Sequence, residues 1–271
     1  MIITDFDAHE RERWTGRAAA YERSFGRLCA YPAEALLDAA GVRAGQRMID
    51  VGTGPGTVAA LALARGADVV AVDAEPSMLT LARRTAPGAT VVEAVLPRLP
   101  FPAGGADAVV ANFVLNHVGN PAAALAELCR VVRPGGRVAV TIWPYPQPPL
   151  QRLWGEIFTA AGGETSADLP RVAPERNFAR TEEGLAGLLA AAGLADVQCA
   201  TLAWEHRADA EDWWAGPANG IGMLGLLMER QPVAVRERIR QQYDLLSARY
   251  RDADGLLVLP TAALLASGRV D

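Results

Sequence analysis

Short apolar runs alternate with segments of helical spacing between residues 46 and 143. Apolar residues recur at helical spacing over residues 55–65, 75–85 and 121–132, each with a proline at or near its start. This alternation predicts right-handed crossovers and a parallel sheet with helices on both faces. The apolar runs, which we expect to be buried strands, are QRMIDV (46–51), ADVVAVD (67–73), ATVVEA (89–94), ADAVVANF (106–113) and GRVAVTIW (136–143).

Segments of different character flank this region. The pattern of residues 1–45 predicts helices. Trp14, Tyr21 and Phe25 are spaced to lie on one helix face, and GVRAG is the turn that leads out of the last helix. The PYPQPP run after residue 143 cannot be a central strand, and the Pro-Gly-Gly of ELCRVVRPGGRV stops a helix before a strand. Further along, the pattern predicts helices in LQRLWGEIFTAAGG, TEEGLAGLLAAAGL and VRERIRQQYDLLSARY, a strand in VQCATLAWEHR, and a last strand or hairpin-like element in GLLVLPTAALLASGRV.

Composition excludes several classes of function. The chain has 271 residues, is 51% hydrophobic and carries a net charge of −5, with its arginines scattered among acids, so we expect an ordered globular protein that does not bind nucleic acid. It contains no lysine, which removes Schiff-base chemistry, pyridoxal phosphate attachment and the phosphate-loop lysine. The amino-terminal MIITDFDAHERERW is charged and the longer apolar runs are interrupted, so we expect a cytoplasmic protein outside the membrane.

Cysteine and histidine usage narrows the chemistry further. Cys29, Cys129 and Cys199 are far apart, odd in number and without metal-ligand spacing, so we expect them to be reduced and structural. No His, Asp and Glu cluster has metal-ligand spacing either, and we expect no metal site.

A glycine-rich loop carries the main functional signal. IDVGTGPGTVAALALARGADVVAVD, residues 49–73, places three glycines at every second position after one apolar run and ends the next run on Asp73. Between a strand and a helix, backbone amides and the helix dipole meet a ligand, and glycine permits its close approach. Asp73 is spaced to accept hydrogen bonds from both ribose hydroxyls of an adenosyl group. A dinucleotide is the weakest alternative, because its fingerprint needs glycine where this chain has Thr57.

With these residues the chain resembles the class I S-adenosylmethionine-dependent methyltransferases, more closely the ubiquinone/menaquinone-biosynthesis-like branch that modifies small molecules. The matching stretches are IDVGTGPG, VDAEPSML, LPFPAGGADAVVANFVLNHV and ELCRVVRPGGRVAV. The resemblance implies S-adenosyl-L-methionine as cofactor and an α/β, Rossmann-like, seven-stranded and mostly parallel sheet whose last strand is antiparallel. The expected organisation is an N-terminal helical cap (1–45), the cofactor-binding core (46–143), an insertion (144–180), the core continued (181–208), an inserted helical lid (209–254) and the last core strand (255–271).

The resemblance also implies roles for individual residues. Asp73 would hold the ribose, and Asp50 would support the methionine ammonium directly or through water. Val95 stands where many relatives have an acid, so adenine recognition would use backbone groups at Val95 and Leu96. Tyr21 and Met78 have core packing as the alternative to a cofactor contact. The remaining expected cofactor contacts are Gly52, Thr53, Gly54 and Gly56 in the loop, Ala74 at adenine and Asn112 near the methionine end.

His117, in NFVLNHVGN after the predicted fourth strand, is the candidate catalytic residue. Methyl transfer to a protonated hydroxyl or amine needs alignment and removal of a proton, which a histidine at this sheet edge can perform as general base. The alternative is a loop histidine that only packs or hydrogen-bonds. The inserted segments should hold the substrate, with GPANGIGMLG allowing a lid to move. Their large apolar side chains, which indicate a hydrophobic pocket or the lid's own core, are Trp143, Trp154, Trp213, Trp214, Met223 and Met228.

These features favour methyl transfer from S-adenosylmethionine to O, N or C of a small hydrophobic or aromatic metabolite, such as a secondary metabolite or quinone-like compound. Two other classes stay open: an enzyme of the same fold that binds the cofactor without methylating, such as a cyclase, and a cofactor-binding scaffold. The expected partner is a small-molecule substrate, with no nucleic acid and no membrane, and a homodimer is left open.

Overall fold

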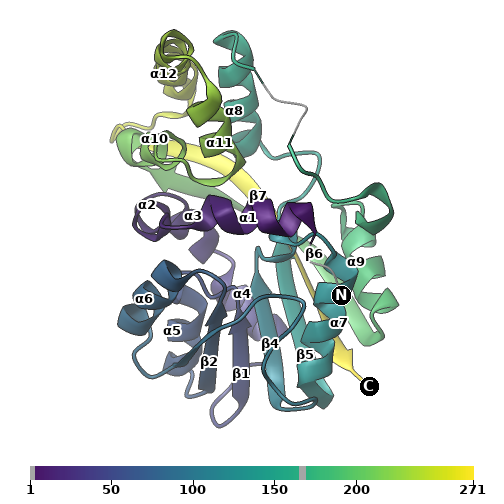
Figure 1. The fold of residues 1–271 in the computed structure, drawn as a ribbon. Helices are drawn as coiled ribbons and strands as arrows, with labels where there is room; N and C mark the ends of the chain where they lie inside the picture. Colours follow the sequence, from purple (N-terminus) through teal and green to yellow (C-terminus); the bar gives the residue numbers. More distant parts are fainter. Residues whose placement is uncertain (1–3, 165–168) are drawn as a thin grey trace.

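The structure, a computed structural model, describes residues 4–164 and 169–271. Its centre is a seven-stranded sheet with the strand order β3-β2-β1-β4-β5-β7-β6 (Figure 1). β7 runs antiparallel to both neighbours, whereas the other neighbouring strands pair in parallel. The expected mostly parallel sheet with an antiparallel last strand is therefore confirmed. The strands are β1 (Arg47–Val51), β2 (Asp68–Asp73), β3 (Thr90–Glu93), β4 (Ala106–Asn112), β5 (Val132–Ile142), β6 (Leu194–Ala208) and β7 (Leu257–Val270).

Helices cover both faces of this sheet, as the alternating pattern predicts. α4 and α5 pack on one face around Leu36 and Val58, and α7 and α9 pack on the other around Leu125 and Leu189. Because both faces are covered, the central strands are buried along most of their length. The helices are α1 (Asp5–Trp14), α2 (Ala18–Arg23), α3 (Phe25–Ala30), α4 (Ala33–Ala39), α5 (Thr57–Ala64), α6 (Pro76–Thr85), α7 (Pro121–Val131), α8 (Pro149–Ala160), α9 (Glu182–Ala191), α10 (Ala210–Ala218), α11 (Gly222–Arg230) and α12 (Val233–Ser247).

Among the element boundaries that differ from the expected ones, two have a clear local cause. The helix expected over 55–65 begins only at Thr57, because Gly56 has a left-handed φ of 89° and therefore precedes the first helical turn. The strand expected over 136–143 begins at Val132, directly after α7. A shift in the β4–β5 register between Ala106 and Ala108 absorbs the Pro-Gly-Gly stretch, so these residues lie inside the strand rather than between the two elements.

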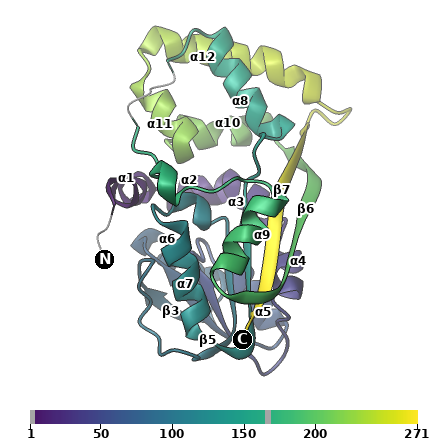
Figure 2. The ribbon, with the colours of Figure 1, turned by 90° about the vertical axis from the view of Figure 1, so that its right-hand side faces the viewer.

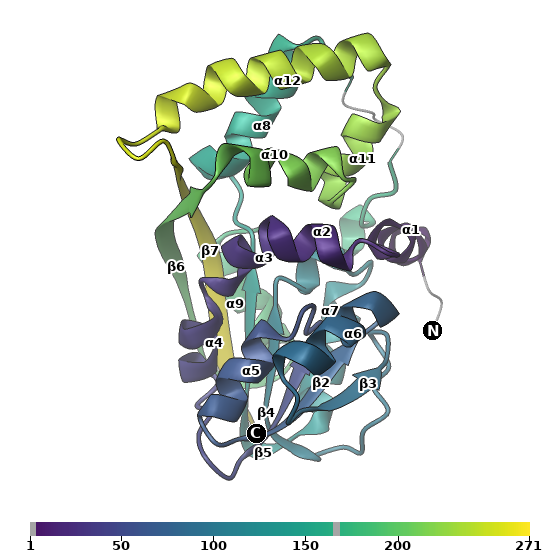
Figure 3. The same ribbon diagram turned by 90° about the vertical axis from the view of Figure 1, so that its left-hand side faces the viewer.

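The amino-terminal segment consists of short helices that cross the top of the sheet. Figure 3 shows α1, α2 and α3 as a band between the sheet with its covering helices below and α8, α10, α11 and α12 above. The expectation that Trp14, Tyr21 and Phe25 share one helix face is wrong, since they lie on α1, α2 and α3 respectively. Gly16, with φ 72°, and Ser24 separate these helices, so the common spacing of the aromatic residues reflects a shared cavity rather than a continuous helix.

The last two strands continue beyond β5 and support a second helical layer. β5 pairs with β7 only from Leu264 onward, whereas β6 and β7 remain paired up to Leu257. Leu257, Leu259 and Trp204 on this extension join the apolar core of α8, α10, α11 and α12. In Figure 2, α9 lies low beside the β6–β7 pair while these four helices form the upper layer. No helix in residues 4–164 or 169–271 is long and apolar enough to cross a membrane.

Candidate functional site

A cavity of about 970 Å³ lies at the carboxyl ends of the central strands, bounded by the amino-terminal helices and the upper layer. It draws Gly52 from the loop after β1, Asp73 from the end of β2, Asn112 from β4 and Trp143 from the end of β5. Ligands of open α/β sheets bind at this edge, where the strand order reverses. The volume is at the upper end of the roughly 300–1,000 Å³ of small-molecule sites, which fits two ligands in one cavity.

The glycine loop shapes one end of this cavity. Gly52 has φ 68°, and a Cβ there would lie 2.4 Å from Cγ2 of Val114. Gly56 has φ 89°, and its Cβ would lie 2.9 Å from the Cα of Ala82 in α6. Both positions therefore need glycine for conformation and for close packing. The N–H of Gly54 donates to Oδ2 of Asp73 at 2.8 Å, which joins the loop to the end of β2.

Asp73 lies where the sequence predicts, with its carboxylate at the cavity wall. Its Oδ1 accepts from the backbone N–H of Glu75 at 3.0 Å, and Oδ2 accepts from Gly54. Burial raises the pKa of Asp73, although these backbone donors partly offset the effect. Since each carboxylate oxygen has two lone pairs, both oxygens retain acceptor capacity for a pair of ligand hydroxyls.

Asp50, Thr53 and Gly56 lie behind the cavity wall rather than in it. Asp50 is fully buried, and its Oδ2 accepts from the Thr53 hydroxyl at 2.7 Å. Burial raises the pKa of Asp50 to about 7, and its Oδ1 has no hydrogen-bond partner among the described residues. The structure therefore supports these three residues as the framework of the loop, whereas the expected support of a ligand ammonium by Asp50 would have to be indirect.

The other expected residues at this end line the cavity. Ala74, Met78, Val95 and Leu96 are all part of its wall. Met78 also packs in a small cluster with Ala18 and Leu81, so core packing and a cavity contact coexist in this residue. The carbonyl of Val95 accepts from the N–H of Arg98 at 3.0 Å.

Asn112 connects the amino-terminal helices to the sheet, and Tyr21, on α2, lines the same cavity. Asn112 donates from Nδ2 to the Cys29 carbonyl at 2.7 Å and accepts from the Thr141 hydroxyl at 2.6 Å. Burial, then the neighbouring Cys29 and Asp73, raise the pKa of Tyr21, and burial raises the pKa of the Cys29 thiol to about 12. Both side chains are therefore neutral, and Cys29 supplies no thiolate nucleophile.

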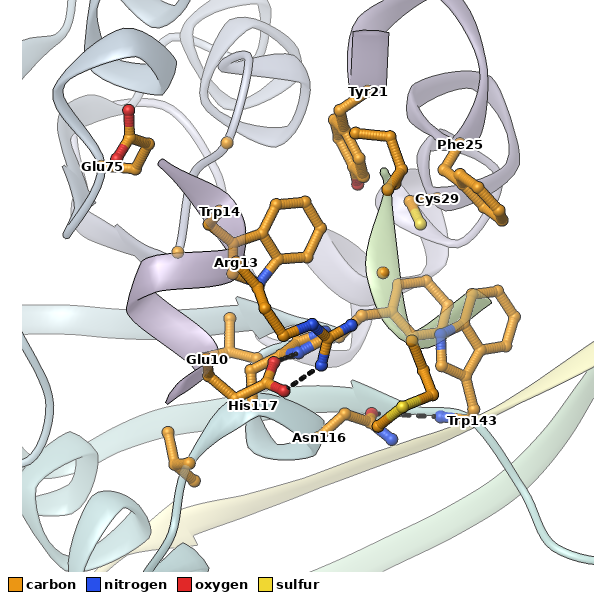
Figure 4. A pocket seen from close by; sticks show the side chains of 18 of the residues that line it. Glu10, Arg13, Trp14, Tyr21, Phe25, Cys29, Glu75, Asn116, His117 and Trp143 are labelled. Atoms are coloured by element: carbon orange, nitrogen blue, oxygen red, sulfur yellow. Dashed lines mark hydrogen bonds and ion pairs between the residues drawn. The ribbon is translucent and has the colours of Figure 1, made fainter. Parts of the chain in front are cut away.

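His117 lies in the cavity wall in a single turn of 3-10 helix (η1, Leu115–His117), and its partners come from α1 (Figure 4). Its Nδ1 is 2.6 Å from Oε2 of Glu10, and Glu10 also pairs with Arg13. Burial opposes the charged form of Glu10, but the His117 hydrogen bond and the charges of His117 and Arg13 prevail and lower the pKa of Glu10. With Nδ1 donating to this carboxylate, Nε2 of a neutral ring is free to accept a proton.

Sequence reasoning missed Glu10, which is buried although α1 has no apolar stripe. The HERER run gives no signal that one carboxylate turns inward, because each of its charges is compatible with a solvated face. Trp14 was expected only as a cap residue, but its ring lies edge-on to His117 with centroids 5.4 Å apart. The histidine is thus held by a carboxylate and an indole from the amino-terminal segment.

The opposite end of the cavity is apolar. Phe113, a non-glycine residue with φ 58°, stacks on Trp143 with ring centroids 4.0 Å apart. Trp154, Leu150 and residues of α11 continue this wall. Of the large side chains singled out in the sequence, Trp143, Trp154 and Met223 line the cavity, whereas Trp213, Trp214 and Met228 belong to the core of the upper layer. No cluster of three or more His, Cys, Asp and Glu side chains that could hold a metal ion occurs in the described part of the chain.

Comparison with known proteins agrees with this geometry. Residues 49–140 match the family model described as a methyltransferase domain. The demethylmenaquinone methyltransferase of Beutenbergia cavernae is 39% identical over 122 residues, which is 45% of this chain and 51% of that protein. The corresponding protein of Thermus thermophilus is 38% identical over 128 residues, 45% of this chain and 57% of its own. The match thus spans about half the length of these relatives.

Solved structures show that the fold likeness extends further along the chain. The YcgJ protein of Bacillus subtilis superimposes with a TM-score of 0.56 at 17% identity, over 88% of this chain and 97% of that one. The [4+2]-cyclase SpnF gives a TM-score of 0.52 at 18% identity, over 89% and 80% of the two chains. These structures share the fold, and the sequence match adds the glycine loop and Asp73 within it. Residues 49–140 of the chain therefore match a methyltransferase domain, set in a fold that these solved structures share.

Proposed function

We propose that the protein transfers a methyl group from S-adenosylmethionine to O, N or C of a small apolar or aromatic metabolite. The observation that carries this proposal is the composition of one cavity. A glycine loop and Asp73 form one end, an aromatic wall forms the other, and His117 contributes to the wall that they share. Small-molecule sites combine mostly apolar walls with a few placed polar groups in this manner.

The residues of the loop end fit an adenosyl cofactor. Asp73 offers acceptor capacity on two oxygens for ribose hydroxyls, and at Gly54 a Cβ would meet nothing closer than 4.0 Å, so the backbone there is open to a ligand. Ala74 and Met78 supply apolar surface for a flat base, and Tyr21 supplies a neutral hydroxyl. The bound cofactor would supply an electrophilic methyl carbon on a sulfonium.

The chain's own contribution to transfer is to exclude water, orient the acceptor and take up its proton. The apolar wall around Trp143 and Trp154 excludes water and orients a flat substrate. His117 accepts the acceptor's proton at Nε2, because Glu10 holds Nδ1 as a donor and stabilises the imidazolium that forms. Glu10 is therefore a positioning residue for the general base.

Cofactor binding is the first test. We expect S-adenosylmethionine and S-adenosylhomocysteine to bind in a calorimetric titration, with NAD as a negative control. Asp73→Asn should weaken binding about tenfold or more, because it removes a charged acceptor worth about 1.5–3 kcal/mol. Asp68→Asn, on the exposed start of the same strand, is the matched control and should bind as the unaltered protein does. Preference for NAD, or equal binding by Asp73→Asn, would refute the cofactor assignment.

Methyl transfer is tested with labelled S-adenosylmethionine and a panel of aromatic and quinone-like acceptors. For a protonated acceptor, His117→Ala should lower kcat about 10²-fold or more while S-adenosylhomocysteine still binds. An unchanged kcat would remove His117 from proton transfer. If the cofactor and an acceptor both bind but no label reaches any acceptor of the panel, the protein is instead an enzyme of the same fold that binds the cofactor without methylating.

A further inference from the structure

Two arginines of the cavity wall have no ion pair among the described residues: Arg11, which is exposed on α1, and Arg180, which is half-buried. Arg180, just before α9, lines the cavity, and its backbone carbonyl accepts from the N–H of Tyr145 at 2.9 Å. This bond fixes Arg180 beside the chain that leads from β5 into α8. Within residues 4–164 and 169–271, the Arg180 guanidinium has no hydrogen-bond or ion-pair partner. Its pKa is lowered by burial, and no acid offsets that effect.

Neutral hydrogen-bond donors lie on the same segment. Gln147 and Gln151 also line the cavity, two and six residues after Tyr145. The Oε1 of Gln151 accepts from the Thr261 hydroxyl at 3.2 Å, and within the described part of the chain its Nε2 has no acceptor. The Gln147 amide, which has no partner among the described residues, offers both donors and an acceptor. Because the Arg180 guanidinium and Nε2 of Gln151 add donors only, this group of side chains presents donors in excess of acceptors.

No acid of the cavity wall pairs with Arg180, and each of these acids already has another partner. Asp7 accepts from the N–H of Gly119 at 2.6 Å, and Glu10 is bonded to His117. Asp73 accepts from two backbone N–H groups, and Glu75 accepts from the N–H of Gly16 at 3.2 Å and from Ser77. All four acids come from α1 or from the end of β2 and the start of α6. The carboxylates and Arg180 therefore come from different elements of the cavity wall.

We propose that the acceptor substrate carries a carboxylate on its apolar or aromatic body, and that Arg180 binds this carboxylate together with Gln147 and Gln151. The inference rests on the proposed methyltransferase function, since it names the substrate class of the same cavity. A planar guanidinium matches a carboxylate through two parallel N–H···O bonds, and the surrounding apolar wall strengthens the pair. The Phe113–Trp143 stack supplies a flat surface for the body of such a molecule.

The test uses paired ligands that differ only in charge. Benzoate and benzamide, 2-naphthoate and 2-naphthamide, and cinnamate and cinnamamide are titrated calorimetrically into protein saturated with S-adenosylhomocysteine. We expect at least one acid to bind about tenfold more tightly than its amide, because hydrogen bonds between two charged groups raise the affinity by about this factor over those to a neutral amide. Arg180→Gln should reduce this preference to about twofold or less. Arg152→Gln, an exposed arginine on α8 outside the cavity wall, is the matched control and should keep it.

Failure of this inference is distinct from failure of the proposed function. If no acid is preferred, or if the preference survives in Arg180→Gln, the carboxylate assignment is wrong while cofactor binding stands. Loss of S-adenosylhomocysteine affinity in Arg180→Gln would assign the arginine to the cofactor and likewise overturn the inference. If the unaltered protein binds no S-adenosylhomocysteine, the same pairs titrated without cofactor give the same two outcomes for Arg180. Should Arg180→Gln fail to fold, Arg180→Lys, which keeps the charge but loses the bidentate geometry, should retain only part of the preference.

Discussion

Removal of the Glu10 carboxylate should detach α1 from the cavity. Glu10 is the only buried residue of this helix, and α1 lacks the apolar stripe by which helices usually dock. Its docking therefore depends on polar contacts to other elements, such as the bond of Glu10 to His117; Arg13, on α1 itself, is the second partner of the Glu10 carboxylate. The side chains of Glu10 and Arg13 are 5% and 9% exposed, so both charges are largely shielded from water. Removing one partner of such a buried ion pair typically destabilises the structure by about 3–5 kcal/mol, because the other charge stays buried without compensation.

The expected result is local opening rather than global unfolding. With about 3 kcal/mol lost, the population of molecules with α1 detached should rise about 100-fold in Glu10→Ala. Hydrogen exchange followed by mass spectrometry should therefore show about 100-fold faster exchange of the amides of residues 5–14, with the central strands unchanged. Glu12→Ala, an exposed position on the same helix, controls for the change in helix propensity.

Acidic pH gives an independent check. Because the pKa of Glu10 is lowered in the folded protein, its contribution is complete above the unfolded value of 4.5 and is lost as pH falls through the folded value. The difference between the unaltered protein and Glu10→Ala should therefore shrink below about pH 4.5. If, at neutral pH, the amides of α1 in Glu10→Ala exchange at a rate within threefold of that in Glu12→Ala, the conclusion that Glu10 holds the helix is refuted.

Further predictions concern the loop and the sheet edge, each checked by urea denaturation. Gly56→Ala should destabilise by about 2 kcal/mol or more, since it adds a clash with α6 to a left-handed φ, whereas Gly187→Ala, at an exposed position of α9, should stabilise by about 0.5–1 kcal/mol. The pKa of Asp50 rises from 3.8 to about 7 on folding, so the folded state holds the extra proton and stability should fall as pH rises across that interval. Asp50→Asn should reduce this slope, to which Asp73 also contributes because burial raises its pKa, and an unchanged slope would assign it elsewhere. Asn112→Ala should destabilise by about 1–3 kcal/mol because its two partners lose their bonds, and a change under 0.5 kcal/mol would contradict this.

Local periodicity was sufficient for most of the fold. Buried parallel strands are apolar throughout and amphipathic helices repeat every 3.6 residues, so the alternation between residues 46 and 143 was readable from neighbours alone. The glycine loop was equally local, since its backbone conformation needs glycine at positions such as Gly52 and Gly56. The expected β5 start was wrong because the register with β4, a tertiary relation, accommodates the Pro-Gly-Gly stretch inside the strand.

The roles of the candidate residues depended on the tertiary structure. The chain itself determined the α/β alternation, the glycine loop, Asp73 at the end of its strand and a histidine after the fourth strand. Only the folded structure placed Asp50 behind the cavity wall and brought Glu10 to His117 across 107 positions of sequence. It also left Arg180 without an acid beside the aromatic wall. A periodic pattern records which face of an element is buried, but it carries no information about which distant side chain will meet that face.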